Sequence, residues 1–256
     1  MEYHKNIGFD KFVILDNNVA NTEKFSDVLQ DYIDDDLVEI EDKIGVLINQ
    51  GEAFQYLYEK NKNRCKWLTF FDFDEFLTIY PQNGRNITVQ EFLNNPRYDK
   101  CEAILINWLM YNDNELLHYD NRPLFVRFTQ AEIGNYQNIW TKPIIRGFLN
   151  KTAFGYQKSS HFPGSEFNIC DCTGKNITPT DAINPPVYEY AQITHFSTKS
   201  TEEYTNKIKR GYPGGVFPKP ESNVELYFTH NKFTKEKLKI FEEAFNRILK
   251  QFPHYK

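Results

Sequence analysis

The first half of the chain alternates short apolar runs with stretches of helical periodicity, and this alternation constrains the fold more than any other feature. Apolar runs of strand length occur at residues 11–15, 37–40, 67–71 and 103–108. Helices are predicted between them at about residues 23–32 (capped by Asn21 or Thr22), at 50–61, and after the capping box Thr88–Glu91. Strands that alternate with helices are typical of an open α/β sheet with mainly parallel strands.

The second half is less regular, with many Gly, Pro, Asn and aromatic residues between positions 130 and 190. A capping box at Ser200–Glu203 predicts a helix that ends at Arg210–Gly211, and a last helix is predicted over 234–252. An apolar stripe follows that last helix at Leu238, Phe241, Phe245, Ile248 and Phe252. Such a stripe indicates core packing or a homodimer face more often than binding to a membrane surface.

Composition excludes several classes of protein. The net charge of -5 argues against a general nucleic-acid coat, so no nucleic-acid partner is predicted. No run of about 18 apolar residues exists, and the first residues lack the apolar core of a signal peptide. The four cysteines have neither redox nor zinc spacing, which favours reduced thiols in a cytoplasmic protein. Aromatic residues make up 16% of the chain, and such rings fill cores or stack on bases and sugars.

The sharpest chemical feature is the Asp72-Phe73-Asp74 sequence that follows the apolar run at 67–71. On a continuing strand, Asp72 and Asp74 would point to one side and Phe73 to the core. Two carboxylates there would suit Mg²⁺ or Mn²⁺ carrying a diphosphate; the alternative is a pair of turn caps. Because ligands of open α/β sheets bind beyond the carboxyl ends of strands, Asp16-Asn17 and Asn107-Trp108 are further candidates. For Asp16, an ordinary Asx turn is the competing interpretation.

Histidines and a basic helix supply the remaining candidates. His161 and His195 could each add an imidazole to the aspartate pair, although a structural role is the commoner one for a single histidine. Basic side chains surround the helix that begins near residue 201: Lys199, Lys207, Lys209 and Arg210. They would either clamp a departing diphosphate or form a solvated basic face.

Four blocks of the sequence resemble the GT-A glycosyltransferases of the family 2 type and their relatives of family 92. The blocks span nearly the whole chain: residues 3–18, residues 67–77, Asn107-Trp108, and residues 195–211. The resemblance implies a GT-A (Rossmann-like) fold, mostly parallel, with C-terminal helices. It also implies a single domain, 1–256, with a nucleotide-sugar half (1–110), an acceptor half (111–215) and a helical segment (216–256). Members begin with a strand and an Asn-Glu pair near the nucleotide, and this sequence opens inside the helix that follows them.

The resemblance further implies an activity and a set of roles. A nucleotide-sugar, a UDP-sugar, would bind through Mn²⁺ or Mg²⁺, with Asp16 and Asn17 near the base or ribose. Asp72 would lie near the ribose and metal, and Asp74 on the metal. Transfer would be inverting: an acceptor hydroxyl attacks the anomeric carbon while a carboxylate takes its proton. The expected acceptor is a glycan or glycolipid, and richness in Asn, Lys and Ile suggests bacterial surface-polysaccharide synthesis in the cytoplasm, peripheral to the inner membrane face.

Several choices stay open at the level of sequence. Asp113 and Glu132 are the candidate catalytic bases, and Trp108, Tyr111, Trp140 and Tyr156 are candidates for stacking on the acceptor. Where family 92 often has Gly-Ser-Gly, this chain reads Tyr111-Asn112-Asp113-Asn114, which bears on acceptor choice. A non-catalytic sugar- or nucleotide-binding protein is the alternative function. A haloacid-dehalogenase phosphatase is disfavoured, because Phe76 stands where that family has Thr or Val.

Overall fold

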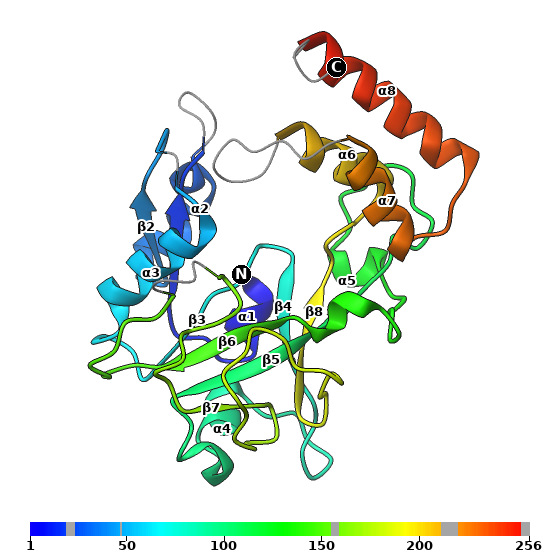
Figure 1. Ribbon diagram of the computed structural model, residues 1–256. Helices are drawn as coiled ribbons and strands as arrows, with labels where there is room; N and C mark the ends of the chain where they lie inside the picture. The colour runs from blue at the N-terminus through cyan, green and yellow to red at the C-terminus, as the bar shows by residue number, and fades with distance from the viewer. Residues whose placement is uncertain (19–23, 47, 155–158, 211–219, 252–256) are drawn as a thin grey trace. The chain divides into compact units, whose positions relative to one another are not determined.

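The computed structural model describes residues 1–18, 24–46, 48–154, 159–210 and 220–251 of the 256-residue chain (Figure 1). Two compact units are present: the first comprises residues 1–108 and 139–193, and the second comprises 109–138 and 194–256. The arrangement of strands and helices confirms the mixed α/β class. A single domain divided after residues 110 and 215 stays a prediction.

A small parallel sheet opens the first unit after the short helix α1 (Glu2–Asn6). Strand β1 (Phe12–Asp16) pairs in parallel with β2 (Val38–Asp42), and helix α2 (Phe25–Asp34) forms the crossover between them. Helix α3 (Gln50–Asn61) follows with the predicted bounds and contacts β1, while α2 contacts β2. The predicted caps of the first helix, Asn21 and Thr22, lie outside the described residues.

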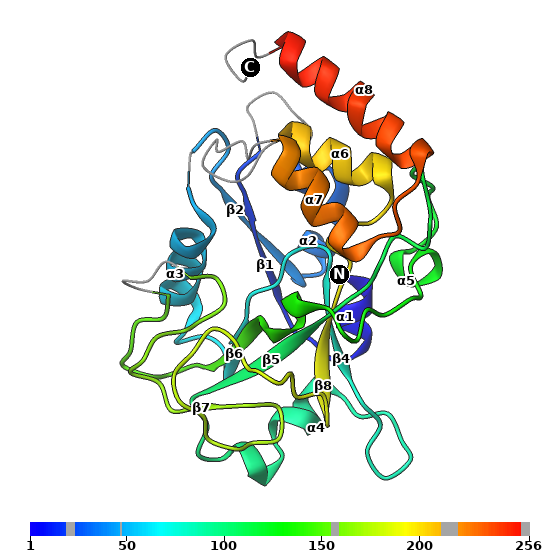
Figure 2. The ribbon, with the colours of Figure 1, turned by 45° about the vertical axis from the view of Figure 1, so that its right-hand side comes forward.

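A larger sheet forms the centre of the first unit (Figure 2). Its strands are β3 (Trp67–Thr69), β4 (Glu75–Ile79), β5 (Ala103–Met110), β6 (Thr141–Arg146), β7 (Ile169–Cys170) and β8 (Ala191–His195). Within the described residues their order is β3-β6-β5-β8-β4, with β7 beside β5. Pairs β3–β6 and β5–β6 are antiparallel and β5–β7 is parallel. The prediction of a mainly parallel sheet is therefore wrong for this sheet, because β6 runs back between β3 and β5 rather than crossing over in parallel.

Both faces of strand β5 are buried, which explains the continuous apolar run of its sequence. Its alternate residues belong to two different clusters: Ala103 and Leu105 pack with α3, whereas Ile104 and Ile106 pack with Phe92 of helix α4 (Val89–Leu93). A strand buried on both faces has no polar positions to alternate. Helix α4 begins at the predicted capping box, in which Thr88 accepts from the Glu91 N–H and Glu91 accepts from the Thr88 N–H.

A disulfide joins Cys101 to Cys170, with their Cα atoms 5.7 Å apart. The prediction that all thiols are reduced is therefore wrong for this pair. The cause lies in the sheet: β5 and β7 pair in parallel with Ile104 opposite Cys170, which brings two residues 69 positions apart into contact. Cys65 and Cys172 are free thiols.

A cavity of about 760 Å³ lies in the first unit between the two sheets. Lys11 and Val13 of the β1 side and Trp67 and Thr69 of β3 are among the residues that line it. In the described part of the chain, β1 pairs only with β2, and β3 pairs only with β6. Strands β1 and β3 therefore both contribute residues to this cavity without pairing to each other.

Helices dominate the second unit. They are α5 (Leu124–Arg127), α6 (Thr201–Arg210), α7 (Pro220–His230) and α8 (Lys235–Gln251). Phe241 of α8 is fully buried against Tyr204 and Tyr227, with Phe245 packed beside them, which confirms core packing for this part of the predicted stripe. Phe252 lies outside the described residues. No helix in the described ranges is both long and apolar enough to cross a membrane.

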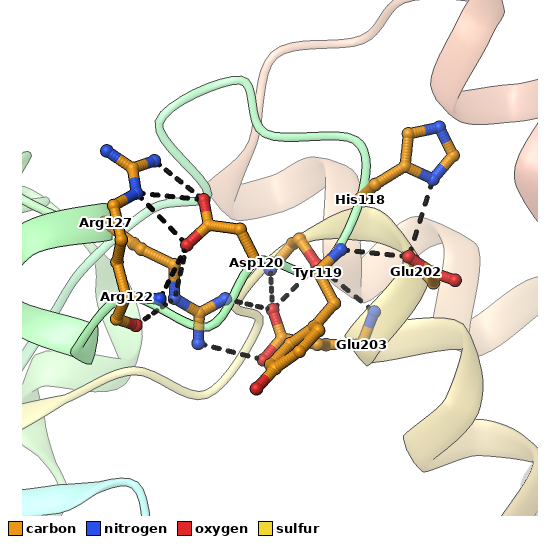
Figure 3. A network of polar contacts seen from close by, with 8 residues as sticks. His118, Tyr119, Asp120, Arg122, Arg127, Glu202 and Glu203 are labelled. Atoms are coloured by element: carbon orange, nitrogen blue, oxygen red, sulfur yellow. Dashed lines mark hydrogen bonds and ion pairs between the residues drawn. The ribbon is translucent and has the colours of Figure 1, made fainter.

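The predicted capping box of α6 is present, and its Glu203 also pairs with Arg127 (Figure 3). Ser200 Oγ accepts from the Glu203 N–H at 3.3 Å, and Glu203 Oε2 accepts from the Ser200 N–H at 3.2 Å. Buried Arg127 donates to both oxygens of Glu203, at 2.6 and 3.1 Å. The start of α6 is therefore tied to α5 by a bidentate ion pair.

Candidate functional site

The Asp72-Phe73-Asp74 sequence forms a turn rather than the end of a strand. Strand β3 ends at Thr69 and β4 begins at Glu75, whose N–H donates to the Asp72 carbonyl at 3.0 Å. The expected alternation fails there, and Phe73 is 71% exposed instead of being a core residue. Its ring stacks on Phe25, the first residue of α2, at 5.1 Å. The turn presents the Asp72 carboxylate, 41% exposed, while Asp74 is buried.

Two side chains from other elements hold the Asp72 carboxylate. Gln50 donates from Nε2 to Oδ1 at 2.5 Å, and the Lys142 ammonium lies 3.4 Å from Oδ2. Gln50 is placed by the start of α3, where Asn49 caps the helix by accepting from the Glu52 N–H at 2.9 Å. Lys142 is on β6. The turn, a helix start and a central strand therefore converge on one half-exposed carboxylate.

Glu75 contacts both Asp72 and Lys142 and is itself fully buried. Its Oε2 accepts from the Asp72 N–H at 2.9 Å and lies 3.3 Å from the Lys142 ammonium. Burial raises the pKa of Glu75, although the charge of Lys142 opposes the shift. Burial alone would lower the pKa of Lys142, but Glu75 and Asp72 outweigh it and raise that pKa. Lys142 is therefore a buried cation at neutral pH.

His161 lies beside this group and keeps a neutral ring. Its Nδ1 is 2.8 Å from the Thr141 carbonyl, next to Lys142 in the sequence. Burial lowers the pKa of His161, and the charge of Lys142 lowers it further. Trp108 meets the His161 ring edge-on at 4.9 Å, and Trp140 lies 5.6 Å from it. Two of the predicted acceptor aromatics therefore surround a predicted metal ligand; Tyr156 lies outside the described residues.

Asp16 ends β1 and is buried, but its carboxylate is engaged locally. Oδ1 accepts from the Asn18 N–H at 3.2 Å, and Oδ2 accepts from the Phe25 N–H at 3.1 Å. This is the geometry of an Asx turn that also caps the start of α2. Asn17 beside it is exposed.

Asn107 does not end a strand, contrary to the expectation. Strand β5 continues to Met110, and Asn107 is buried within it. Its amide donates to the carbonyls of Ile139 and Ile183 at 3.1 and 3.2 Å, and its Oδ1 accepts from the Val187 N–H at 3.0 Å. These bonds tie two loops to the sheet, which is a structural role.

The candidate bases belong to the second unit and have different surroundings. Asp113 is buried; its Oδ2 accepts from the Tyr227 hydroxyl at 2.5 Å and lies 2.5 Å from the Lys237 ammonium. Its Oδ1 accepts from the Glu115 N–H at 2.8 Å, so both oxygens are engaged. Glu132 is half-buried and accepts from Asn112 Nδ2 at 2.7 Å. Of the two carboxylates, Glu132 is the more accessible to an acceptor.

The other candidates of the second unit are each placed on or near α6 and β8. His195 is buried at the end of β8, and its carbonyl accepts from the Tyr111 N–H at 3.1 Å. Lys199 adopts a left-handed backbone (φ 54°) just before α6. Lys207 donates to the Ser197 carbonyl at 3.4 Å. Arg210 is the last residue of α6, and its side chain is outside the described part of the structure.

The donor set fits a hard divalent cation only as a partial site. In the described ranges, no three or more His, Cys, Asp or Glu side chains gather closely enough to hold a metal ion alone. A cation held at the Asp72–Asp74 turn would therefore need phosphate and water oxygens as further ligands, as Mg²⁺ and Mn²⁺ sites commonly allow.

Sequence reasoning missed three residues of this site: Gln50, Glu75 and Lys142. Gln50 was expected only as the first residue of a helix, and Glu75 only as a neighbour of the aspartates. A lysine within the run Thr141–Ile145, otherwise free of charge, was the one available signal.

The turn, its supporting lysine and the α/β framework are consistent with an enzyme that binds a sugar nucleotide, and sequence comparison identifies the class as a glycosyltransferase. The sequence model described as Glycosyltransferase family 92 matches residues 1–147, and the chain belongs to this family. The match includes Asp16, Asp72, Asp74, Glu132 and Lys142. No curated protein matches the chain. As a glycosyltransferase, the protein uses a nucleotide-sugar donor and an acceptor.

Proposed function

We propose that the chain is a metal-dependent inverting glycosyltransferase that moves a sugar from a UDP-sugar to a hydroxyl of a glycan or glycolipid. The observation that carries this proposal is the Asp72–Asp74 turn, with the half-exposed Asp72 carboxylate fixed between Gln50 and Lys142. A carboxylate that is both accessible and held in place suits a ligand that must be oriented. The GT-A character of the fold is part of the same proposal.

On the donor side, Asp74 would hold Mn²⁺ or Mg²⁺ and Asp72 would contact the ribose and the metal. His161 is the proposed additional ligand in the first unit, where its Nδ1 lies 2.8 Å from the carbonyl of Thr141, the neighbour of Lys142. Asp16 and Asn17 would lie near the base or ribose. The roles expected for residues of the second unit stay predictions: His195 as a metal ligand, and Lys199, Lys207 and Arg210 as contacts of the diphosphate.

In the reaction, the oxygen of the acceptor hydroxyl forms a bond to the anomeric carbon as the bond to the diphosphate oxygen breaks. The hydroxyl proton passes to a carboxylate. When bound, the cation supplies positive charge that stabilises the leaving diphosphate. We favour Glu132 over Asp113 as the base, since both oxygens of Asp113 are already held by buried partners.

For the acceptor, Trp108 and Tyr111 are the proposed stacking residues. Trp108 contacts the His161 ring, and Tyr111 contacts the Phe196 ring at 5.2 Å. Aromatic faces of this kind bind the apolar faces of sugar rings. We propose synthesis of a bacterial surface polysaccharide as the role, at the cytoplasmic face of the inner membrane.

Calorimetry of UDP with and without Mn²⁺ tests the donor site. We expect binding that depends on the metal, and its loss in Asp74→Ala with retained circular dichroism. Asp99→Ala, at an exposed aspartate away from the turn, is the matched control and should bind as the wild type does. Metal-independent binding, or equal binding by Asp74→Ala, would remove the proposed site.

A panel of nucleotide sugars tests the reaction. Hydrolysis or transfer should be detectable with at least one UDP-sugar, and NMR of the product should show an inverted anomeric centre. Glu132→Gln should lower kcat by about 100-fold or more with little effect on UDP binding, which is typical of loss of a general base. Metal-dependent UDP binding without turnover across the panel would favour the non-catalytic binding protein.

A further inference from the structure

Lys142 is an unusual residue for the centre of a sheet. Its side chain is fully buried on β6, with the Phe54 ring 5.3 Å from the ammonium, and no other charged residue stands between Thr141 and Ile145. Placing an ammonium group there removes its hydration, which costs several kcal/mol even when it is paired. Replacing buried ion pairs with apolar side chains is often neutral or stabilising. Stability alone therefore does not explain this lysine.

The partners of Lys142 suggest its purpose. Glu75 is as deeply buried as the lysine, at 3.3 Å, whereas Asp72 is 41% exposed and lies 3.4 Å away. Lys142 therefore connects the interior of the unit to a carboxylate that faces outward. Glu75 also accepts from the Asp72 N–H, so the buried partner of the lysine holds the backbone of Asp72.

The second oxygen of Asp72 is held independently. Gln50 Nε2 donates to Oδ1 at 2.5 Å, while the ammonium of Lys142 faces Oδ2. One donor on each oxygen fixes the rotation of the carboxylate plane, which neither donor would do alone. Groups that orient a ligating carboxylate typically affect metal affinity strongly.

We propose that Lys142 is a positioning residue of the donor site: it fixes the Asp72 carboxylate in the orientation that takes the metal-bound nucleotide. This inference rests on the proposed function, and it adds the residue that prepares the site before the donor arrives. Lys142 itself does not contact the donor. Its charge acts through Asp72. The attraction orients the Asp72 carboxylate before the donor binds, so binding does not have to supply the free energy of that ordering.

The test is a double-mutant cycle measured by calorimetry of UDP in the presence of Mn²⁺. Lys142→Met should weaken binding by about 10- to 100-fold while the circular dichroism spectrum is retained. In an Asp72→Asn background the same substitution should weaken binding by no more than about twofold, because the lysine acts only through Asp72. Lys100→Met, at an exposed lysine, is the control and should bind as the wild type does.

The outcomes distinguish a failure of the positioning role from a failure of the proposed function. If folded Lys142→Met binds UDP as tightly as the wild type does, the positioning role is overturned and the proposed function stands. An equal loss of affinity in both backgrounds has the same consequence. Absence of metal-dependent UDP binding by the wild type overturns the function and this inference with it. If Lys142→Met fails to fold, Lys142→Met/Glu75→Leu replaces the buried pair with apolar groups. That double variant should fold and still lose UDP binding, and retained affinity would refute the role.

Discussion

We expect His4 on α1 to make the first unit less stable in mild acid. The ring is buried between Phe71 and Phe76, at centroid distances of 5.2 and 5.7 Å, and its Nε2 accepts from the Leu77 N–H at 3.2 Å. Only a neutral ring can accept that bond. Burial lowers the pKa of His4 from 6.5 to about 4. The folded state therefore excludes a proton that the unfolded chain readily binds.

The change in the free energy of unfolding with pH follows from the difference between the pKa values of His4 in the folded and unfolded states. A folded pKa below the unfolded value contributes stability that is present above pH 6.5 and is lost as the pH falls toward 4. With these two pKa values, the loss between pH 7 and pH 5 is about 2 kcal/mol, and by pH 4 it is about 3 kcal/mol. Against a typical free energy of unfolding of about 5–15 kcal/mol, this is a large fraction.

His4→Gln tests the assignment, because glutamine can still accept from the Leu77 N–H but does not titrate. Unfolding in urea would be followed by tryptophan fluorescence, which reports on the first unit, since Trp67, Trp108 and Trp140 all belong to it. At pH 7 the variant should be less stable by about 1 kcal/mol, for lost ring contacts. Between pH 7 and pH 5 it should lose about 2 kcal/mol less than the wild type. His118→Gln, at an exposed histidine, should keep the wild-type slope; identical slopes for the wild type and His4→Gln would refute the reasoning.

Three further outcomes are expected. Thr88→Ala should lower the free energy of unfolding by about 1 kcal/mol in urea denaturation, because it removes the N-cap of α4; an unchanged midpoint would contradict this. Asp113→Ala should cost about 3–5 kcal/mol, since it leaves the Lys237 ammonium buried without its carboxylate; a stable, inactive variant would instead restore Asp113 as a candidate base. Thiol titration of the denatured chain should find two groups before reduction and four after it, as the Cys101–Cys170 disulfide requires, and four at the outset would disprove the bond.

Much of the first half could be predicted because local pattern and tertiary environment agree there. Helix α3 has the predicted bounds, and strand β5 was visible as an apolar run because both its faces are covered. The capping boxes at Thr88 and Ser200 were also visible, since they use only residues three positions apart. Signals of this kind are contained within one stretch of sequence.

What could not be predicted depends on pairing between distant segments. Strand β6 carries Lys142, Pro143 and Arg146, which weaken its apolar signal, and its antiparallel place between β3 and β5 is set by the sheet as a whole. The pairing of Cys101 with Cys170 depends on β7, only two residues long. The apolar run continues two residues beyond β3, so it predicts a strand up to the point where the chain turns at Asp72.

The two-stranded sheet of β1 and β2 has a consequence for local opening. A pair of strands is marginal by itself, and the adjoining helix α2 buries none of its residues. Segments with so little buried surface open without global unfolding, so the amides of β1 should exchange with solvent hydrogen faster than those of β5. Asp16 ends this segment. A ligand that engages Asp16 would therefore slow the amide hydrogen exchange of β1 and β2. Hydrogen exchange would then report donor binding without any catalytic turnover.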